Sequence, residues 1–176
     1  MRRKILGAAV AVVLGAGLLT ACASAGGDEL RYAGDYAGHR PLAVVGFPSA
    51  GSLQVVQEVV WALGEGDAER LAAVATDDGD ADAVGKTAAN WIAAFGKGAR
   101  GKVTAEFYDE GSERQVVVLY FHDTGRTKDL VVRVTNDGGP AWGWRVRLNE
   151  PDPAEAAAAP TWAPKEPGAH GSLSVP

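Results

Sequence analysis

The sequence predicts an α+β domain in which about three helices precede a curved antiparallel sheet of about four strands and cover one of its faces. Two observations support this prediction. Between residues 52 and 96, apolar side chains recur every three to four positions, which is the period of an amphipathic helix. From residue 102 to residue 148 they alternate with polar side chains, which is the period of a half-buried strand.

Three helices are expected in the first half of this domain. The first begins near Ser52 and ends at Gly66, because glycine readily adopts the left-handed conformation that terminates a helix. Asp67 is a favourable N-cap for the second helix. An acidic loop over residues 77–82 precedes the third helix, which Gly96 is expected to close. The apolar stripe of that third helix has clear helical spacing: Val84, Ala88, Trp91, Ile92 and Phe95.

Four strands follow, and the turns between them predict how they pair. If residues 123–126 join their two strands symmetrically, Leu119 lies opposite Leu130, and the next hairpin places Trp144 opposite Val132. One face is then apolar and meets the helices: Val103, Phe107, Val117, Leu119, Phe121, Leu130, Val132, Val134, Trp142, Trp144 and Val146. The other face is mixed and carries an apolar patch: Val116, Val118, Tyr120 and Val131. We expect this patch to bind a partner protein or a second copy of the chain.

The first 21 residues have the features of an export signal. Three basic residues follow Met1, and no charged or strongly polar side chain occurs from residue 5 to residue 19. This apolar run is shorter than the roughly 20 residues that a membrane span requires. The pair Arg2 and Arg3 also resembles a twin-arginine signal, but the short basic head and the very apolar run favour the general secretion route.

The four residues Leu19, Thr20, Ala21 and Cys22 resemble the lipobox of bacterial lipoproteins. In that family the cysteine sulfur receives a diacylglyceryl group, and the signal is cut just before it. The resemblance implies cleavage between Ala21 and Cys22, with Cys22 as the lipidated first residue of the mature chain. Two or more acyl chains make a stable anchor, whereas one holds a protein only marginally. The alternative is an unlipidated secreted protein in which Cys22 is an ordinary residue near the cut.

Composition narrows the partners of the mature chain. Removal of residues 1–21 takes away three basic and no acidic residues, so the formal charge changes from −5 to −8. A chain this acidic is not expected to bind nucleic acid or to adhere electrostatically to anionic lipids. Attachment to the outer face of the bacterial cytoplasmic membrane would therefore rest on the acyl chains of Cys22. With its single cysteine acylated, the mature chain cannot form a disulfide.

Less ordered segments are expected on both sides of the domain, which spans about residues 50–149. Residues 22–49 have the composition of a flexible tether, although the apolar run 42–47 could dock on the domain as an edge strand. Residues 150–176 contain six of the nine prolines and are predicted to be a disordered tail. Trp162 in this tail is expected to dock on the domain or to serve as a recognition point, docking being the more common outcome.

Residues 61–71 (WALGEGDAERL) resemble the first helical hairpin of the nuclear-transport-factor-2-like superfamily, and residues 143–146 (GWRV) resemble its closing strand. The resemblance covers about residues 52–148. It implies a cone-shaped fold in which helices pack against a curved antiparallel sheet. It does not imply one function, because this fold hosts isomerases, dehydratases, hydrolases and many binding modules.

Catalytic and metal-binding patterns in the sequence are weak. Enzymes of the superfamily place Asp, His or Tyr inside the cone, whereas the inward strand positions here are almost all aliphatic or aromatic. His122 and Asp123 are neighbours in a strand and would point to opposite faces, which favours a solvated strand end. Asp78, Asp80 and Asp82 have the opening spacing of a calcium loop, but its turn glycine and closing glutamate are missing. We therefore expect no cofactor, no metal ion and no catalytic residue.

The leading hypothesis is a lipid-anchored cell-envelope protein with a small non-enzymatic binding domain. It would bind a partner protein through the apolar patch, or a small apolar ligand inside the cone. The first alternative is an enzyme of the same fold, of isomerase, dehydratase or hydrolase type, that acts on a small apolar substrate. Its pocket would be lined by Trp91, Phe95, Trp142 and Trp144. The second alternative is a structural envelope spacer, supported only by the tether and the tail.

Overall fold

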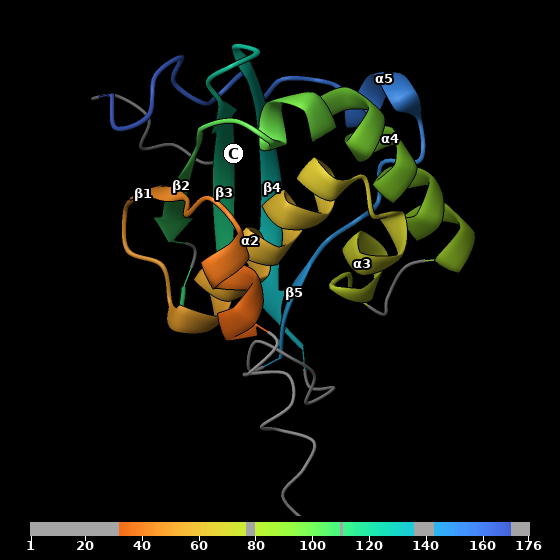
Figure 1. The fold of residues 1–176 in the computed structure, drawn as a ribbon, viewed down its shortest axis with the longest axis horizontal. Helices are drawn as coiled ribbons and strands as arrows, with labels where there is room; N and C mark the ends of the chain where they lie inside the picture. Colours follow the sequence, from red (N-terminus) through yellow and green to blue (C-terminus); the bar gives the residue numbers. More distant parts are fainter. Residues whose placement is uncertain (1–31, 77–79, 110, 136–142, 170–176) are drawn as a thin grey trace, which may run out of the picture. The chain divides into compact units, whose positions relative to one another are not determined.

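The computed structural model describes residues 32–76, 80–109, 111–135 and 143–169. The described residues from Tyr36 onward belong to one compact unit, which is the body discussed below (Figure 1). The predicted signal, Cys22 and Trp142 lie outside the described residues. Within the described ranges, no helix has both the length and the apolar character needed to cross a membrane.

Three helices form where the sequence predicts them, and side chains cap each one. Helix α2 spans Ala50–Glu65, α3 spans Ala68–Ala73 and α4 spans Ala81–Ala99. Ser49 caps α2, three residues before the predicted start. Gly66 ends that helix with a positive φ of 76°, as expected. The predicted cap Asp67 accepts a hydrogen bond from the Arg70 backbone N–H at 2.9 Å.

The end of α4 differs from the prediction. Gly96 does not close the helix, which continues to Ala99. A Cβ atom on Gly96 would lie 2.8 Å from the backbone oxygen of Leu63, and one on Gly98 would lie 2.7 Å from the Cβ atom of Phe121. These glycines are therefore sites of close approach to α2 and to the sheet, and not signals that stop the helix.

The sheet has five strands in the order β1-β2-β3-β4-β5 and is open. Their bounds are Ala43–Val45, Val103–Asp109, Arg114–Phe121, Arg126–Val134 and Trp144–Val146. The four predicted strands pair in antiparallel fashion, whereas β1 pairs in parallel with β2. The α+β class is thus confirmed, but the sheet is mixed because the apolar run 42–47 supplies an edge strand.

Both predicted strand registers are wrong by two residues. Val117 lies opposite Leu130, and Trp144 lies opposite Val134. The first hairpin is displaced because its loop covers residues 122–125, where the N–H of Gly125 donates to the Phe121 carbonyl at 2.9 Å. A shift of two residues returns every side chain to the same face, so the predicted division into two faces survives.

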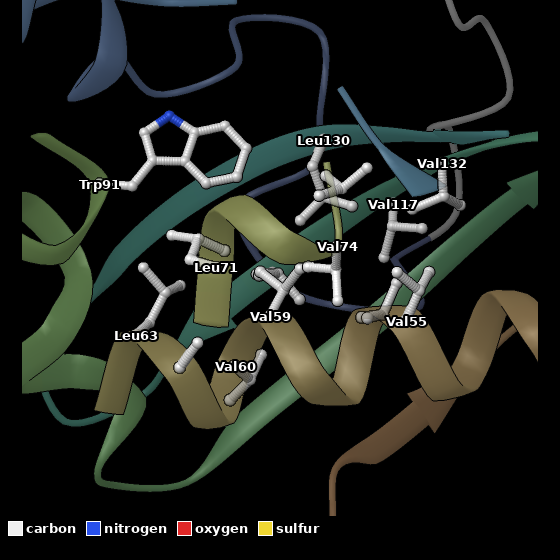
Figure 2. Close-up of a cluster of buried hydrophobic side chains, with 14 of the residues drawn as sticks. Val55, Val59, Val60, Leu63, Leu71, Val74, Trp91, Val117, Leu130 and Val132 are labelled. Atoms are coloured by element: carbon white, nitrogen blue, oxygen red, sulfur yellow. The ribbon is translucent and has the colours of Figure 1, made fainter. Parts of the chain in front are cut away.

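The main core lies between the helices and the inner face of the sheet (Figure 2). Val59 and Leu63 of α2 point toward the sheet, and Leu71 of α3 and Trp91 of α4 close the same layer. The sheet contributes the side chains that the sequence predicted for this face. Val134 is half-buried, and the other described members are buried: Val103, Phe107, Val117, Leu119, Phe121, Leu130, Val132, Trp144 and Val146.

The described part of the C-terminal tail, residues 150–169, packs on the domain, which differs from the disorder expected from its composition. Helix α5 spans Pro153–Ala156, is capped by Asp152 and lies beside α4 (Figure 1). Ala156 is fully buried in the main core. Residues 160–168, which we call the strap, then contact the outer face of the sheet through Trp162 and its neighbours. The tail is ordered because a few anchoring side chains find sites on the domain, although most of its residues remain exposed.

Candidate functional site

The outer face of the sheet carries the most extended candidate site in the described residues. Strands β2 and β3 bring four side chains into a second apolar cluster, separate from the main core: Tyr108, Val116, Val118 and Tyr120. The register explains the grouping, since Tyr108 lies opposite Val116, which in turn lies opposite Val131 of β4. The patch predicted from sequence is therefore assembled, with Tyr108 as an additional member.

The strap covers this patch. Trp162 and Ala163 pack against the cluster, and Val116 and Tyr120 each retain only 4% of their exposure. The ring of Trp162 meets that of Tyr108 edge-on, with 5.3 Å between centroids and 78° between planes. The indole N–H of Trp162 also donates to Asp129 Oδ2 at 3.3 Å. The patch is thus occupied by the chain's own tail.

A buried carboxylate forms the polar part of the site. Glu106 accepts a hydrogen bond from the Tyr120 hydroxyl at 2.8 Å and one from the Gly168 backbone N–H at 3.2 Å. The same hydroxyl lies 3.3 Å from the carbonyl oxygen of Pro164. Burial, followed by the neighbouring Glu106, raises the pKa of Tyr120 well above its ordinary value near 10. Tyr120 therefore stays a neutral hydrogen-bond donor to Glu106, and the other oxygen of that carboxylate accepts from the Gly168 N–H of the strap.

A shallow hollow continues the site beside the strap. Its volume is about 450 Å³, and Tyr120, His122, Lys165 and Glu166 are among the residues that line it. His122 Nε2 lies 2.8 Å from Thr104 Oγ1. The carboxylate of Asp123 instead lies against Gly101, so the two neighbours contact different parts of the domain.

The predicted pocket lining is packed and not open. Trp91, Phe95 and Trp144 are at most 5% exposed and belong to the main core. Phe95 stacks on Phe121 with a centroid distance of 5.3 Å, and the Arg126 guanidinium lies 4.7 Å from the centre of the Phe95 ring. These three side chains fill the space between the helices and the sheet, so they offer no cavity to a substrate.

A buried ion pair beside Trp91 was not predicted. Lys128 Nζ lies 2.7 Å from both carboxylate oxygens of Glu150, and the Trp91 indole N–H donates to the same carboxylate at 2.8 Å. Lys128 is only 3% exposed. The signal was present in the alternation of β4, because Lys128 shares the inward parity of Leu130 and Val132. The inward position of Lys128 was missed because it lies near the start of the strand, where polar residues are usually exposed.

A second hollow lies between the chain before α2 and the helices. It encloses about 210 Å³ and is lined in part by His39, Trp61, Glu65 and Arg100. The His39 ring stacks on Trp61 at 4.8 Å, and its Nε2 atom lies 2.8 Å from Glu65 Oε1. Arg70 binds the other oxygen of Glu65 at 2.9 Å. These contacts attach the end of the predicted tether to α2.

Metal-binding side chains do not gather in the part of the chain that the structure describes. No group of three or more His, Cys, Asp or Glu residues there could hold an ion. Of the three aspartates with the opening spacing of a calcium loop, Asp80 caps α4 and Asp82 lies in its first turn, whereas residues 77–79 lie outside the described ranges. Asp80 thus has a structural role in the helix.

Comparison of the chain with known protein families, curated proteins and solved structures finds no match. A function must therefore be argued from the site itself. The outer face offers an apolar floor, a buried carboxylate and a neutral hydroxyl, all facing an extended segment of chain. Such an arrangement binds a polypeptide through side-chain packing and a few directed hydrogen bonds.

Proposed function

We propose that the chain is a lipid-anchored protein on the outer face of the bacterial cytoplasmic membrane, with a non-enzymatic domain that binds a partner protein. Its signal would be removed before Cys22, and acyl chains on that residue would hold it. The observation that carries the binding role is the outer face of the sheet, where Val116 and Tyr120 are buried in an apolar cluster against which the irregular strap packs. An apolar face of this kind is suited to recognition.

The contents of the core support binding over catalysis. The three described side chains of the predicted substrate pocket, Trp91, Phe95 and Trp144, are packed against other core residues. The inner Lys128 and Glu150 bind each other and Trp91. An enzyme that used this region would have to open the core and break a buried ion pair before a substrate could enter.

We also propose that the fold is a variant of the nuclear-transport-factor-2-like cone. Three helices cover one face of a sheet whose strands β2 to β5 form an antiparallel meander. The α2–α3 hairpin turns at Gly66 and Asp67, the positions on which the sequence resemblance rests. A crystal structure with a strongly curved sheet that wraps around its helices would support this assignment, whereas a flat sheet with its helices on another face would contradict it.

The mass of the mature N-terminus tests the anchor. We expect the native protein to begin at Cys22 with a diacylglyceryl group on its sulfur and to partition into membranes. The Cys22→Ser variant is expected to appear in the soluble fraction, since acyl attachment requires the sulfur. An unmodified N-terminus at any other residue would contradict the anchor.

Site-specific photo-crosslinking tests the binding face. A photoreactive amino acid at Val131, which borders the patch and is half-buried, should crosslink the membrane-anchored protein to one identified partner. The partner should crosslink in return from its own contact site. A matched probe at Glu69, on the exposed side of α3, should not give this product. Equal products from both positions would reject the outer face as the binding surface.

A further inference from the structure

We propose that the strap is a releasable internal ligand, and that the partner binds the same face with an extended segment of the same chemistry, a tryptophan flanked by prolines. This inference rests on the proposed binding role of the outer face. Its starting point is that residues 160–168 already occupy the face and show which groups it recognises.

The strap is held by few contacts. Residues 160–168 form no strand with the sheet, and Thr161, Lys165, Glu166 and Gly168 are exposed. The strap is attached to the face through the Trp162 ring and its N–H, the Pro164 carbonyl near the Tyr120 hydroxyl and the Gly168 N–H. A segment with so few buried contacts opens more readily than the core beneath it. The strap can therefore leave while the domain stays folded.

The remainder of the tail would stay in place when the strap leaves. Ala156 is buried in the core, and the Arg126 guanidinium donates to the Ala157 carbonyl at 3.1 Å. Upstream, Glu150 is fixed by Lys128 and Trp91. The strap thus remains tethered at Ala157, which gives it a high effective concentration at the face. A competing segment binds only when it overcomes this tethered competitor.

The contacts of the strap define the chemistry of the competitor. An aromatic ring with an N–H fits between Tyr108 and Asp129, because the ring packs edge-on with Tyr108 and the N–H donates a hydrogen bond to the Asp129 carboxylate. Two positions later the Pro164 carbonyl oxygen lies 3.3 Å from the Tyr120 hydroxyl, whose proton goes to Glu106, and near the end of the strap a backbone N–H donates to the same Glu106 carboxylate. Prolines suit the stretches between, since they lack an N–H and favour an extended backbone.

A competition experiment with the full-length chain tests this proposal. The probe is a labelled synthetic peptide with the sequence of residues 158–169, and its binding is followed by fluorescence anisotropy. We expect at least tenfold tighter binding to the Trp162→Ala variant than to the wild-type chain, because the variant lacks the internal competitor. Thr161→Ala, an exposed change within the strap, should bind the peptide as the wild type does.

Two further measurements complete the test. Gly168→Pro removes the N–H that binds Glu106 and excludes the observed φ of 74°, so it should also release the strap and tighten peptide binding. Hydrogen exchange should rise in residues 160–169 of both variants while α2 stays protected. A peptide in which alanine replaces the tryptophan should bind neither variant.

Equal peptide affinity for the wild type and both variants, or no binding to either variant, would overturn the proposal. Concentration-dependent dimers of the wild-type chain in sedimentation equilibrium would overturn the assignment to a partner, because strap exchange between copies would then explain the site. The assay contains no membrane and no partner. A negative result in the peptide assay therefore does not contradict the membrane anchor at Cys22 or the crosslinking at Val131. Negative results in those two tests likewise do not change the measured peptide affinities.

Discussion

Lys128 is a cation on the helix-covered face of the sheet, and Glu150 is its nearer counter-charge, since Asp129 Oδ1 lies 3.9 Å from its Nζ atom. Both carboxylate oxygens of Glu150 lie 2.7 Å from its Nζ atom, and the Trp91 ring lies 5.1 Å away. A buried ion pair adds little stability relative to apolar residues of the same shape, but the removal of one partner leaves the other charge uncompensated. Glu150 therefore couples the tail to the core.

We expect Glu150→Ala to lower the free energy of unfolding by about 3 kcal/mol, because Lys128 would remain buried without its carboxylate. Urea denaturation monitored by tryptophan fluorescence measures this change. Glu155→Ala, an exposed change on α5, is the matched control and should alter the free energy by less than about 0.5 kcal/mol. Similar losses for the two variants would show that the ion pair has no special role.

The second residue-scale prediction concerns the ionisation of Tyr120. Burial and the adjacent Glu106 raise its pKa in the folded state above the unfolded value near 10. Folding therefore favours the protonated hydroxyl, and the contribution of this group to stability is present below about pH 10 and is lost as the pH rises further. In a spectrophotometric titration, Tyr120→Phe should give the same tyrosinate absorbance as the wild type while both remain folded. A smaller absorbance change in the variant would contradict this assignment.

At the scale of elements, helix α4 depends on two glycines that bring it close to its neighbours. A side chain at Gly98 would collide with Phe121 of β3, so Gly98→Ala should lower the free energy of unfolding by about 1–3 kcal/mol. Gly85 lies in the same helix with open space around it, and Gly85→Ala should raise the free energy by about 0.5–1 kcal/mol. Thermal unfolding of the two variants measures both signs. Stabilisation by both substitutions would show that close packing at Gly98 does not limit the helix.

Local patterns predicted the elements well because period and caps are properties of neighbouring residues. Asp67, Gly66 and the alternation in β2 to β4 were sufficient for this purpose. The strand registers were missed by two residues, since they depend on the conformation of the loops, and Gly125 fixes one of them. The end of α4 was missed because a glycine required for contact has the same appearance in sequence as one that ends a helix.

The candidate site was predicted in part for a related reason. Alternation was enough to bring Val116, Val118, Tyr120 and Val131 to one face. Docking of Trp162 on the domain was predicted and is confirmed, but the face on which it docks was not, because the tail is held by isolated contacts such as that between Trp162 and Asp129. The amino-acid composition of a segment predicts only its average tendency to be ordered, whereas docking of the tail depends on a few individual side chains.

At the scale of the whole molecule, the tail from Glu150 to Ala156 is part of the folded unit. A chain that stops after Asn149 loses the ion pair and the buried Ala156, and we expect its free energy of unfolding to fall by about 3 kcal/mol or more. A chain that stops after Ala169 retains every contact described here and should stay within about 0.5 kcal/mol of the full-length protein. Chemical denaturation of the two truncated chains measures the difference. Equal stability of both would show that the tail does not contribute to the fold.

The attachment of Glu150 also sets the order in which the polypeptide can fold during synthesis. Its backbone N–H donates to Thr87 Oγ1, its carboxylate meets Lys128, and Ala156 enters the core. Ribosomes release the chain from its N-terminus, so α2, α4 and the sheet emerge before the residues that complete their packing. The domain therefore completes its packing only after Ala156 has left the ribosome. For a chain exported as we propose, this delay keeps the polypeptide in the loose form that a secretion channel accepts.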